Sequence, residues 1–294
     1  MPDVILCKPK SLPEHRQLGA AARAVRENGA NRPLLERLSL VMTGFAPTKL
    51  AIAVVTTKFW RGGGVDLTVK FLDNPEAALR KRILLHMNAW SDFANVRFRE
   101  TSGDAQVRVA READGYWSYV GTDILDQELT DKQTMNLEAF TMSTPESEFV
   151  RVVRHETGHT LGCPHEHMRR QLVNRVDRAK AYKYFLATQG WDRNTVDQQV
   201  LTALEDSSIM GTTSADETSI MCYQLPAEIM KDGKPIIGGK DIDQVDRAFM
   251  ATIYPPKPRA KRSAKTMAQE KAKGAVRKVA GRSTSKTDTP RGRR

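Results

Sequence analysis

Four of the six histidines fall within thirteen residues, in a run that begins at His155 and ends at His167. The run matches His-Glu-x-x-His-x-x-Gly-x-x-His, in which the three motif histidines are His155, His159 and His165. Three imidazoles with an open fourth position are typical of a catalytic zinc site, whereas structural zinc sites are closed by four protein ligands. The spacing therefore predicts one catalytic Zn²⁺ per chain.

Glu156 is the candidate general base. It follows His155 directly on the predicted helix, so its side chain points too far from the shared histidine face to be a favourable third ligand. It is well placed to contact a water beside the metal. Zinc lowers the pKa of such a water to about 7 and polarises the scissile carbonyl. A carboxylate at this position takes the proton of the attacking water and passes it to the leaving amine. The motif thus predicts hydrolysis of peptide bonds.

A helix has to position these side chains. The stretch Ser143-Thr144-Pro145-Glu146 offers a hydroxyl cap, a proline for the first turn and an acid near the positive helix end. Residues four apart share a helix face, so the first two histidines present their rings side by side. Gly162 can adopt the left-handed conformation that ends a helix, and Pro164 prevents its continuation. We therefore expect His165 to return to the metal from a different direction.

The pattern resembles that of the metzincin zinc endopeptidases, and Glu166 and Arg169 after the third histidine resemble the astacin branch, in its bacterial and fungal form. The resemblance covers roughly residues 48–255. It includes Lys58-Phe59-Trp60, Trp90 through Phe98 and Trp117-Ser118-Tyr119-Val120-Gly121. It implies protein or peptide substrates and an α+β fold, with a twisted mixed sheet, an active-site helix and a lower subdomain containing a methionine turn. It also implies that an edge strand of the sheet binds substrate in extended form.

Metzincins carry the methionine turn beneath the metal. Ser219-Ile220-Met221-Cys222-Tyr223 matches it, so the resemblance implies that Met221 forms the hydrophobic floor. It also implies that Tyr223 is a displaceable extra ligand whose hydroxyl stabilises the oxyanion. A second Ser-Ile-Met at 208–210 has no tyrosine two residues on, and we choose the later copy.

Hydrophobic patterns predict the remaining elements of the catalytic domain. We expect a buried strand run at 50–55, and strands at 65–71, 96–99, 106–110, 116–120 and 134–140. Asn74-Pro75 opens a helix on which Leu79, Ile83, Met87 and Trp90 recur at helical spacing. Val107 and Val109 are expected on one side of their strand, with Arg108 on the other. Further helices are expected around 178–186, 195–204 and 242–253.

Residues 1–47 are expected to form an N-terminal extension, with helices over 16–28 and 34–42. Leu18, Ala21, Ala22 and Val25 share one side of the first helix. The extension is either a pro-region or a brace across the domain, and the brace is favoured because no acidic latency motif is evident. Cys7 is a candidate thiolate cap for the zinc, but nothing around it resembles a known switch segment, so we do not expect this role.

The net charge of +11 belongs to the third region, residues 256–294, which holds 14 Lys and Arg against two acids and leaves the rest of the chain nearly neutral. Such a composition cannot bury enough apolar surface to offset chain entropy. The tail is either a tether for nucleic acid or another anionic polymer, or simply a solvated disordered tail. Without interleaved aromatic residues, base stacking is not expected.

The three cysteines do not form a disulfide framework. A bond between Cys163 and Cys222 is conceivable, because both segments should converge on the metal, but two small buried residues are favoured. No apolar run approaches the roughly 18 residues of a membrane helix, and no secretory signal is evident. The chain is therefore expected to be cytoplasmic by default, with non-classical secretion as the alternative. The sequence does not indicate an oligomeric state.

The favoured function is that of a zinc-dependent endopeptidase. One alternative is a catalytically silent zinc-binding module, against which Glu156 argues, since such a module needs no base. The other is a nucleic-acid-associated protein that acts through its basic tail.

Overall fold

The computed structural model describes Cys7 and residues 10–32, 56–203 and 215–257. One structural unit spans Met1–Pro256, and a second begins at Lys257. Several predicted features lie outside the described residues: the strand run at 50–55, the helix over 34–42, the Ser-Ile-Met at 208–210 and the basic tail from residue 258. The boundaries at 47 and 255 stay predictions.

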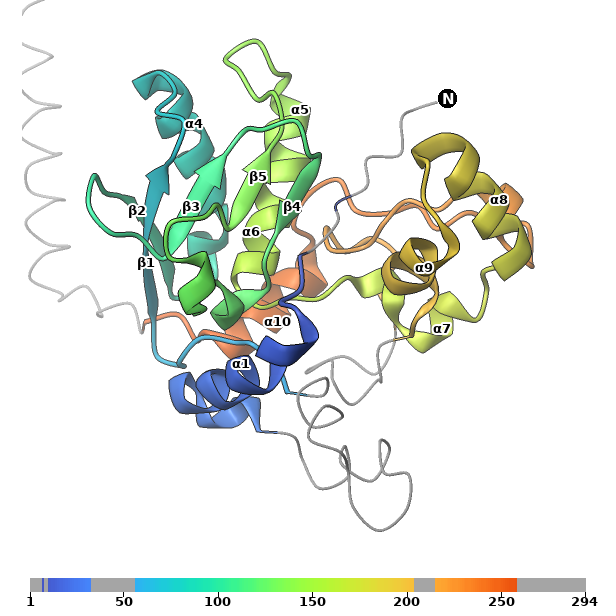
Figure 1. Cartoon of the computed structure of the whole chain (residues 1–294), viewed down its shortest axis with the longest axis horizontal. Helices are drawn as coiled ribbons and strands as arrows, with labels where there is room; N and C mark the ends of the chain where they lie inside the picture. Colours follow the sequence, from blue (N-terminus) through green and yellow to red (C-terminus); the bar gives the residue numbers. More distant parts are fainter. Residues whose placement is uncertain (1–6, 8–9, 33–55, 204–214, 258–294) are drawn as a thin grey trace, which may run out of the picture. The chain divides into compact units, whose positions relative to one another are not determined.

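A five-stranded mixed sheet forms the frame of the first unit (Figure 1). Its strands are β1 (Val65–Phe71), β2 (Val96–Glu100), β3 (Val107–Ala110), β4 (Tyr116–Ser118) and β5 (Met135–Leu137). They lie in the order β2-β1-β3-β5-β4, with only β4 antiparallel to its neighbour. The predicted α+β class and mixed sheet are confirmed, and β4 is an edge strand.

Both faces of β3 are covered. Val107 and Val109 are buried, and so is Arg108, which was expected on the opposite side of the strand. Its guanidinium lies among backbone carbonyls, to which it donates hydrogen bonds, including those of Ala105 and Lys132 at 2.6 and 2.7 Å. Buried cationic groups are tolerated when their donors are paired in this way.

Helix α4 (Ala77–Met87) follows β1 and buries the apolar stripe expected from the sequence. Leu79, Ile83, Met87 and Trp90 are all fully covered, with Trp90 in the 3-10 turn that continues the helix. The indole Nε1 of Trp90 donates to the carbonyl of Arg154 at 3.0 Å. Figure 1 shows α4 on the same side of the sheet as the helix that carries the histidines, so this bond joins the two helices.

The lower half of the unit is built from short helices. They are α7 (Arg170–Val173), α8 (Arg178–Gln189), α9 (Arg193–Val196) with a π-helical turn over Asp197–Leu201, and α10 (Gln244–Ile253). Each helix predicted after the histidine run is present. Asp243 and Asp246 form a capping box at the start of α10.

Helix α1 spans Glu14–Glu27, close to its predicted range. Its buried face differs from the prediction, because Ala20, Ala21 and Ala24 are covered while Leu18 is 42% exposed. Small alanines let the helix backbone approach the 3-10 turn over Gly121–Leu125, which α1 contacts. Close packing against a neighbouring turn therefore decides the face, rather than the largest side chain.

Two hydrophobic cores meet at the histidines. The upper core joins the sheet to α4 and the histidine-bearing helix, and includes Trp90 and Met221. The lower core gathers around Phe185 and Trp191, and includes Cys7, Cys222 and Tyr223. Among the described residues, no helix has the length and apolar character needed to cross a membrane.

Candidate active site

The first two motif histidines, His155 and His159, lie on a helix with three consecutive parts: α5 (Glu146–Glu148), a π-helical turn (Phe149–Val153) and α6 (Arg154–Thr160). The predicted hydroxyl cap is wrong, because Pro145 occupies the N-cap and no side chain caps the helix. The Thr144 hydroxyl instead accepts a hydrogen bond from the backbone amide of Thr141 at 3.0 Å. Without a hydroxyl cap, the packing of Phe149, which is fully buried, holds this end.

Helix α6 ends at Thr160, and Gly162 two residues later has a φ of 103°, in the left-handed region, as expected. The carbonyls left free by the last turn are satisfied from a distance. The indole of Trp60 donates to the carbonyl of Thr160 at 2.8 Å, and the hydroxyl of Tyr254 donates to that of Leu161 at 2.6 Å. Elements at both ends of the catalytic domain thereby fix the helix that carries the first two histidines.

All three motif histidines converge. The Nε2 atom of His165 lies 3.1 Å from that of His155 and 3.0 Å from that of His159. On the opposite side of the rings, Nδ1 of His155 lies 2.6 Å from the carbonyl oxygen of Ile220, and Nδ1 of His159 lies 2.8 Å from that of Cys163. A carbonyl accepts only, so each of these Nδ1 atoms carries the proton and Nε2 presents a lone pair.

This cluster fits a zinc ion. Tetrahedral zinc with bonds of about 2.0–2.1 Å places its nitrogen ligands about 3.3 Å apart, close to the spacing found here. Burial lowers the pKa of His155 to about 4 and holds those of His159 and His165 well below their usual range, so the rings are neutral. A cation among these nitrogens would engage the Nε2 lone pairs of His155 and His159, and carbonyls on the outer nitrogens are the usual support of a metal-bound histidine.

Glu156 lies on the same helix, with its side chain directed into the site and almost fully buried. Burial raises the pKa of its carboxyl to about 8, and a cation at the histidines would favour the ionised form. Its Oε2 accepts a hydrogen bond from the thiol of Cys7, whose Sγ lies 3.2 Å away. This contact joins residues 149 positions apart in the chain, so Cys7 is a site residue that lies outside the zinc motif.

The methionine turn lies beneath the helix, as expected. A Cβ atom added to Gly158 would lie 2.4 Å from the sulfur of Met221, so the absence of a side chain at position 158 lets the turn pack directly against α6. The backbone amide of Glu166 donates to the carbonyl of Met221 at 2.9 Å. Glu166 also forms a buried ion pair with Arg169. These contacts tie the loop of His165 to the turn.

Tyr223 faces the histidines from the lower core. Its ring centroid lies 4.2 Å from that of His165, and its hydroxyl is buried with no hydrogen-bond partner among the described residues. His167 supports it by stacking at 4.0 Å, and the Nδ1 of His167 accepts from the backbone amide of Tyr223 at 3.4 Å. The zinc motif gives His167 no role, although its place in the histidine run is a usable signal. An unpaired buried hydroxyl is expensive unless a ligand or substrate engages it.

Asp246 anchors the methionine turn from α10. Its carboxylate accepts from the Ser219 hydroxyl at 2.6 Å and from the Ile220 amide at 3.0 Å. Because Ile220 also supplies the carbonyl that orients His155, Asp246 belongs to the support of the site. The sequence pattern predicts that a helix starts near Asp246, but it does not indicate that Asp246 supports the site.

We expect the free energy of unfolding to depend on pH through Asp246. Burial raises the pKa of its carboxyl from 3.8 to about 6, so between these values the folded protein binds a proton that the unfolded chain releases. The contribution of this proton to the free energy of unfolding is fully present below pH 3.8 and is lost as the pH rises through 6. The total contribution is about 3 kcal/mol. Asp246→Asn cannot titrate. The difference in unfolding free energy between wild type and this variant, measured by urea denaturation, should therefore change across that window. A difference independent of pH contradicts the assignment.

All three cysteines are buried and free, so the favoured prediction of unpaired Cys163 and Cys222 is confirmed.

Comparisons with known proteins agree with this geometry. The family model described as Astacin, a family of peptidases, matches residues 54–244. Two solved structures of myroilysin are similar to the chain. One is 29% identical with a TM-score of 0.64 and covers 70% of this chain and 99% of its own. The other is 30% identical with a TM-score of 0.51 and covers 67% and 86%.

A hatching enzyme zinc-protease from the medaka fish Oryzias latipes is 18% identical, with a TM-score of 0.47 and coverage of 67% and 94%. No curated protein sequence matches the chain. The family model spans well over half of the residues and includes the whole histidine run and the methionine turn. The chain therefore belongs to the astacin family of zinc metalloendopeptidases, which use one catalytic zinc ion.

Proposed function

We propose that this chain cleaves internal peptide bonds with zinc held by His155, His159 and His165 and with Glu156 as the general base. One observation carries the assignment: the Nε2 atom of His165 lies 3.1 and 3.0 Å from those of His155 and His159, beside the buried carboxyl of Glu156. A surface helix with incidental histidines would have no reason to bring three imidazole nitrogens to one buried point.

Each residue has a distinct task. When bound, zinc supplies a Lewis acid that acidifies water and polarises the scissile carbonyl. Glu156 then takes the proton from the attacking water and delivers it to the leaving amine. Tyr223, with its free hydroxyl, donates a hydrogen bond to the oxygen on which negative charge develops. Met221 packs under α6 and keeps the base of the site apolar.

The arrangement disfavours a catalytically silent zinc module. Burying Glu156 costs free energy, since its ionised form loses hydration, and a metal site that only stabilises the fold would gain nothing from this. Burial in a cleft beside a metal is instead what a base for water attack requires.

Residues 256–294 are proposed as a tether for an anionic polymer such as nucleic acid, in addition to the peptidase activity. The support is the concentration of 14 basic residues in a stretch with two acids. A tether acts by raising the local concentration of the enzyme near its substrate, not by changing the chemistry.

Both proposals can be tested with the full chain and with a chain that lacks residues 256–294. Each is expected to retain one zinc and to cleave a quenched-fluorescence peptide library at similar rates, whereas only the full chain should bind a heparin column at moderate salt. A Cys7→Ala variant is assayed alongside, because Cys7 touches Glu156. The absence of cleavage in every zinc-loaded form would refute the peptidase, and equal heparin binding would refute the tether.

A further inference from the structure

The sulfur of Cys7 lies inside the zinc site. Its Sγ and one ligand atom from each of His155, His159 and His165 all lie within 4.8 Å of one another, and all four side chains are buried. Among the described residues, this is the group whose ligand atoms are gathered closely enough to hold a metal ion. A thiolate is a soft, strongly bound ligand for zinc, and three histidines with one cysteine complete a tetrahedral set.

We propose that Cys7 is the fourth protein ligand of the zinc, and that the segment carrying it keeps the peptidase latent. The docked segment consists of Cys7 and residues 10–27. The ligand assignment rests on the cluster itself, whereas the latency rests on the proposed function.

The position of the sulfur explains how it blocks catalysis. The attacking water has to contact both the metal and Glu156. Cys7 Sγ already lies 3.2 Å from Oε2 of Glu156 while facing the three histidines. The sulfur therefore takes the place that the water needs, and a site with four protein ligands has no open position.

The docked segment also covers the free side of β4. Cys7 forms a parallel backbone bridge with Tyr116, and Lys10 forms one with Tyr119. The amide of Lys10 donates to the carbonyl of Ser118 at 3.1 Å, and its ammonium pairs with Asp114 at 3.0 Å. An extended peptide that adds to an exposed sheet edge uses these same backbone groups. The segment thus competes for the strand edge as well as for the metal.

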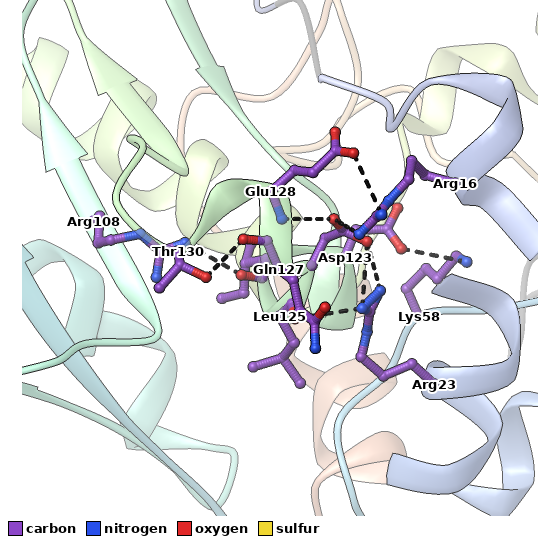
Figure 2. Close-up of polar contacts among 11 residues, drawn as sticks. Arg16, Arg23, Lys58, Arg108, Asp123, Leu125, Gln127, Glu128 and Thr130 are labelled. Atoms are coloured by element: carbon purple, nitrogen blue, oxygen red, sulfur yellow. Dashed lines mark hydrogen bonds and ion pairs between the residues drawn. The ribbon is translucent and has the colours of Figure 1, made fainter. Parts of the chain in front are cut away.

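Helix α1 anchors the segment, as Figure 2 shows, with Arg16 and Arg23 reaching from the helix to the loop after β4. Both guanidinium groups pair with the Asp126 carboxylate, at 2.5 and 2.7 Å, and that carboxylate is almost fully buried. Arg16 also pairs with Glu128 at 3.3 Å. These two charge-assisted contacts to one buried carboxylate fix the position of α1. Because α1 and Cys7 belong to the same segment, Cys7 is held near the metal site at a high effective concentration.

Cobalt substitution tests the ligand directly. Cobalt(II) bound to a thiolate has a sulfur-to-metal charge-transfer band in the near ultraviolet. We expect this band in the cobalt-loaded wild type and in Cys222→Ala, a control that removes another buried cysteine of the lower core, and we expect its loss in Cys7→Ala. A band that persists in Cys7→Ala, or is missing from the wild type, overturns the assignment.

Alkylation of the wild-type chain tests the same contact without a variant. Iodoacetamide should leave Cys7 unmodified in the zinc-loaded protein and should modify it after zinc is removed with a chelator, as read by peptide mass mapping. Cys163 and Cys222 serve as internal references for buried thiols that do not bind metal. Equal modification of Cys7 with and without zinc contradicts ligation.

Latency is tested by peptide cleavage. Cys7→Ala, loaded with zinc, should cleave the peptide library faster than the wild type by about tenfold or more, since a tethered ligand at millimolar effective concentration occupies the site most of the time. Arg16→Ala combined with Arg23→Ala should raise activity by a smaller factor. Equal rates in wild type and Cys7→Ala overturn the latency. If neither protein cleaves, the peptidase proposal fails, while the cobalt band still decides the ligand.

Discussion

Glu156→Gln is expected to lower kcat/KM for peptide cleavage by about 10³-fold, the middle of the range for a positioned general base. Glutamine has nearly the same shape and fills the same buried position, but its amide cannot take a proton from water. The loss corresponds to about 4 kcal/mol of transition-state stabilisation. The metal ligands are untouched, so zinc content should stay at one per chain. Both quantities are best measured in the Cys7→Ala background, where the thiol does not contact residue 156.

Tyr223→Phe provides the comparison for this prediction. It removes only the free hydroxyl and keeps the stacking on His167, so we expect about a 10²-fold loss, as for one oxyanion donor. A general base removed from the same site should cost more than a single donor. If Glu156→Gln retains activity within tenfold of its parent, Glu156 is not the base.

Removal of His165 is expected to cost the enzyme its metal. Its Nε2 contacts both other ligand nitrogens, so His165→Ala breaks the centre of the cluster. Loss of a residue that only supports a ligand weakens metal binding by about 10–100-fold, and loss of a ligand should exceed this. At limiting zinc the variant should then be nearly inactive. The metal also stabilises the fold, by about 4 kcal/mol when its concentration is a thousand times its Kd.

His167→Ala is the matched control, since it removes a neighbouring buried histidine that lies outside the metal cluster. Zinc content after dialysis, measured by mass spectrometry, should fall in His165→Ala and persist in His167→Ala. A chelator should lower the melting temperature of the wild type and of His167→Ala but leave that of His165→Ala almost unchanged. Equal zinc retention in the two variants contradicts the ligand assignment.

The part of the site that the sequence predicts well is local. His155, Glu156 and His159 lie within five residues, and helical geometry alone orients them. The turn at Gly162 follows from its need for positive φ. Strand β1 has the predicted bounds, because a buried face demands its apolar pattern, whereas β5 spans only Met135–Leu137 of the predicted 134–140.

The rest depends on contacts between distant residues. Cys7 meets Glu156 across 149 positions, and no short-range pattern encodes that pairing. The apolar pattern of α1 predicts a face that contains Leu18, yet the close approach of a neighbouring turn buries Ala20 and Ala24 instead. Likewise the cap expected at Thr144 fails because its hydroxyl bonds back to Thr141. In each case a tertiary contact or a competing hydrogen bond outweighs the local preference.

The contacts that orient His155 bear on when the metal site can form during synthesis of the chain. A peptide of residues 146–167 would contain every histidine ligand but neither the carbonyl of Ile220 nor the carboxylate of Asp246 that holds Ile220 in place. Ribosomes deliver the chain from its N-terminus, so these supports emerge long after the motif itself. We therefore expect tight metal binding only after the chain through α10 has been synthesised.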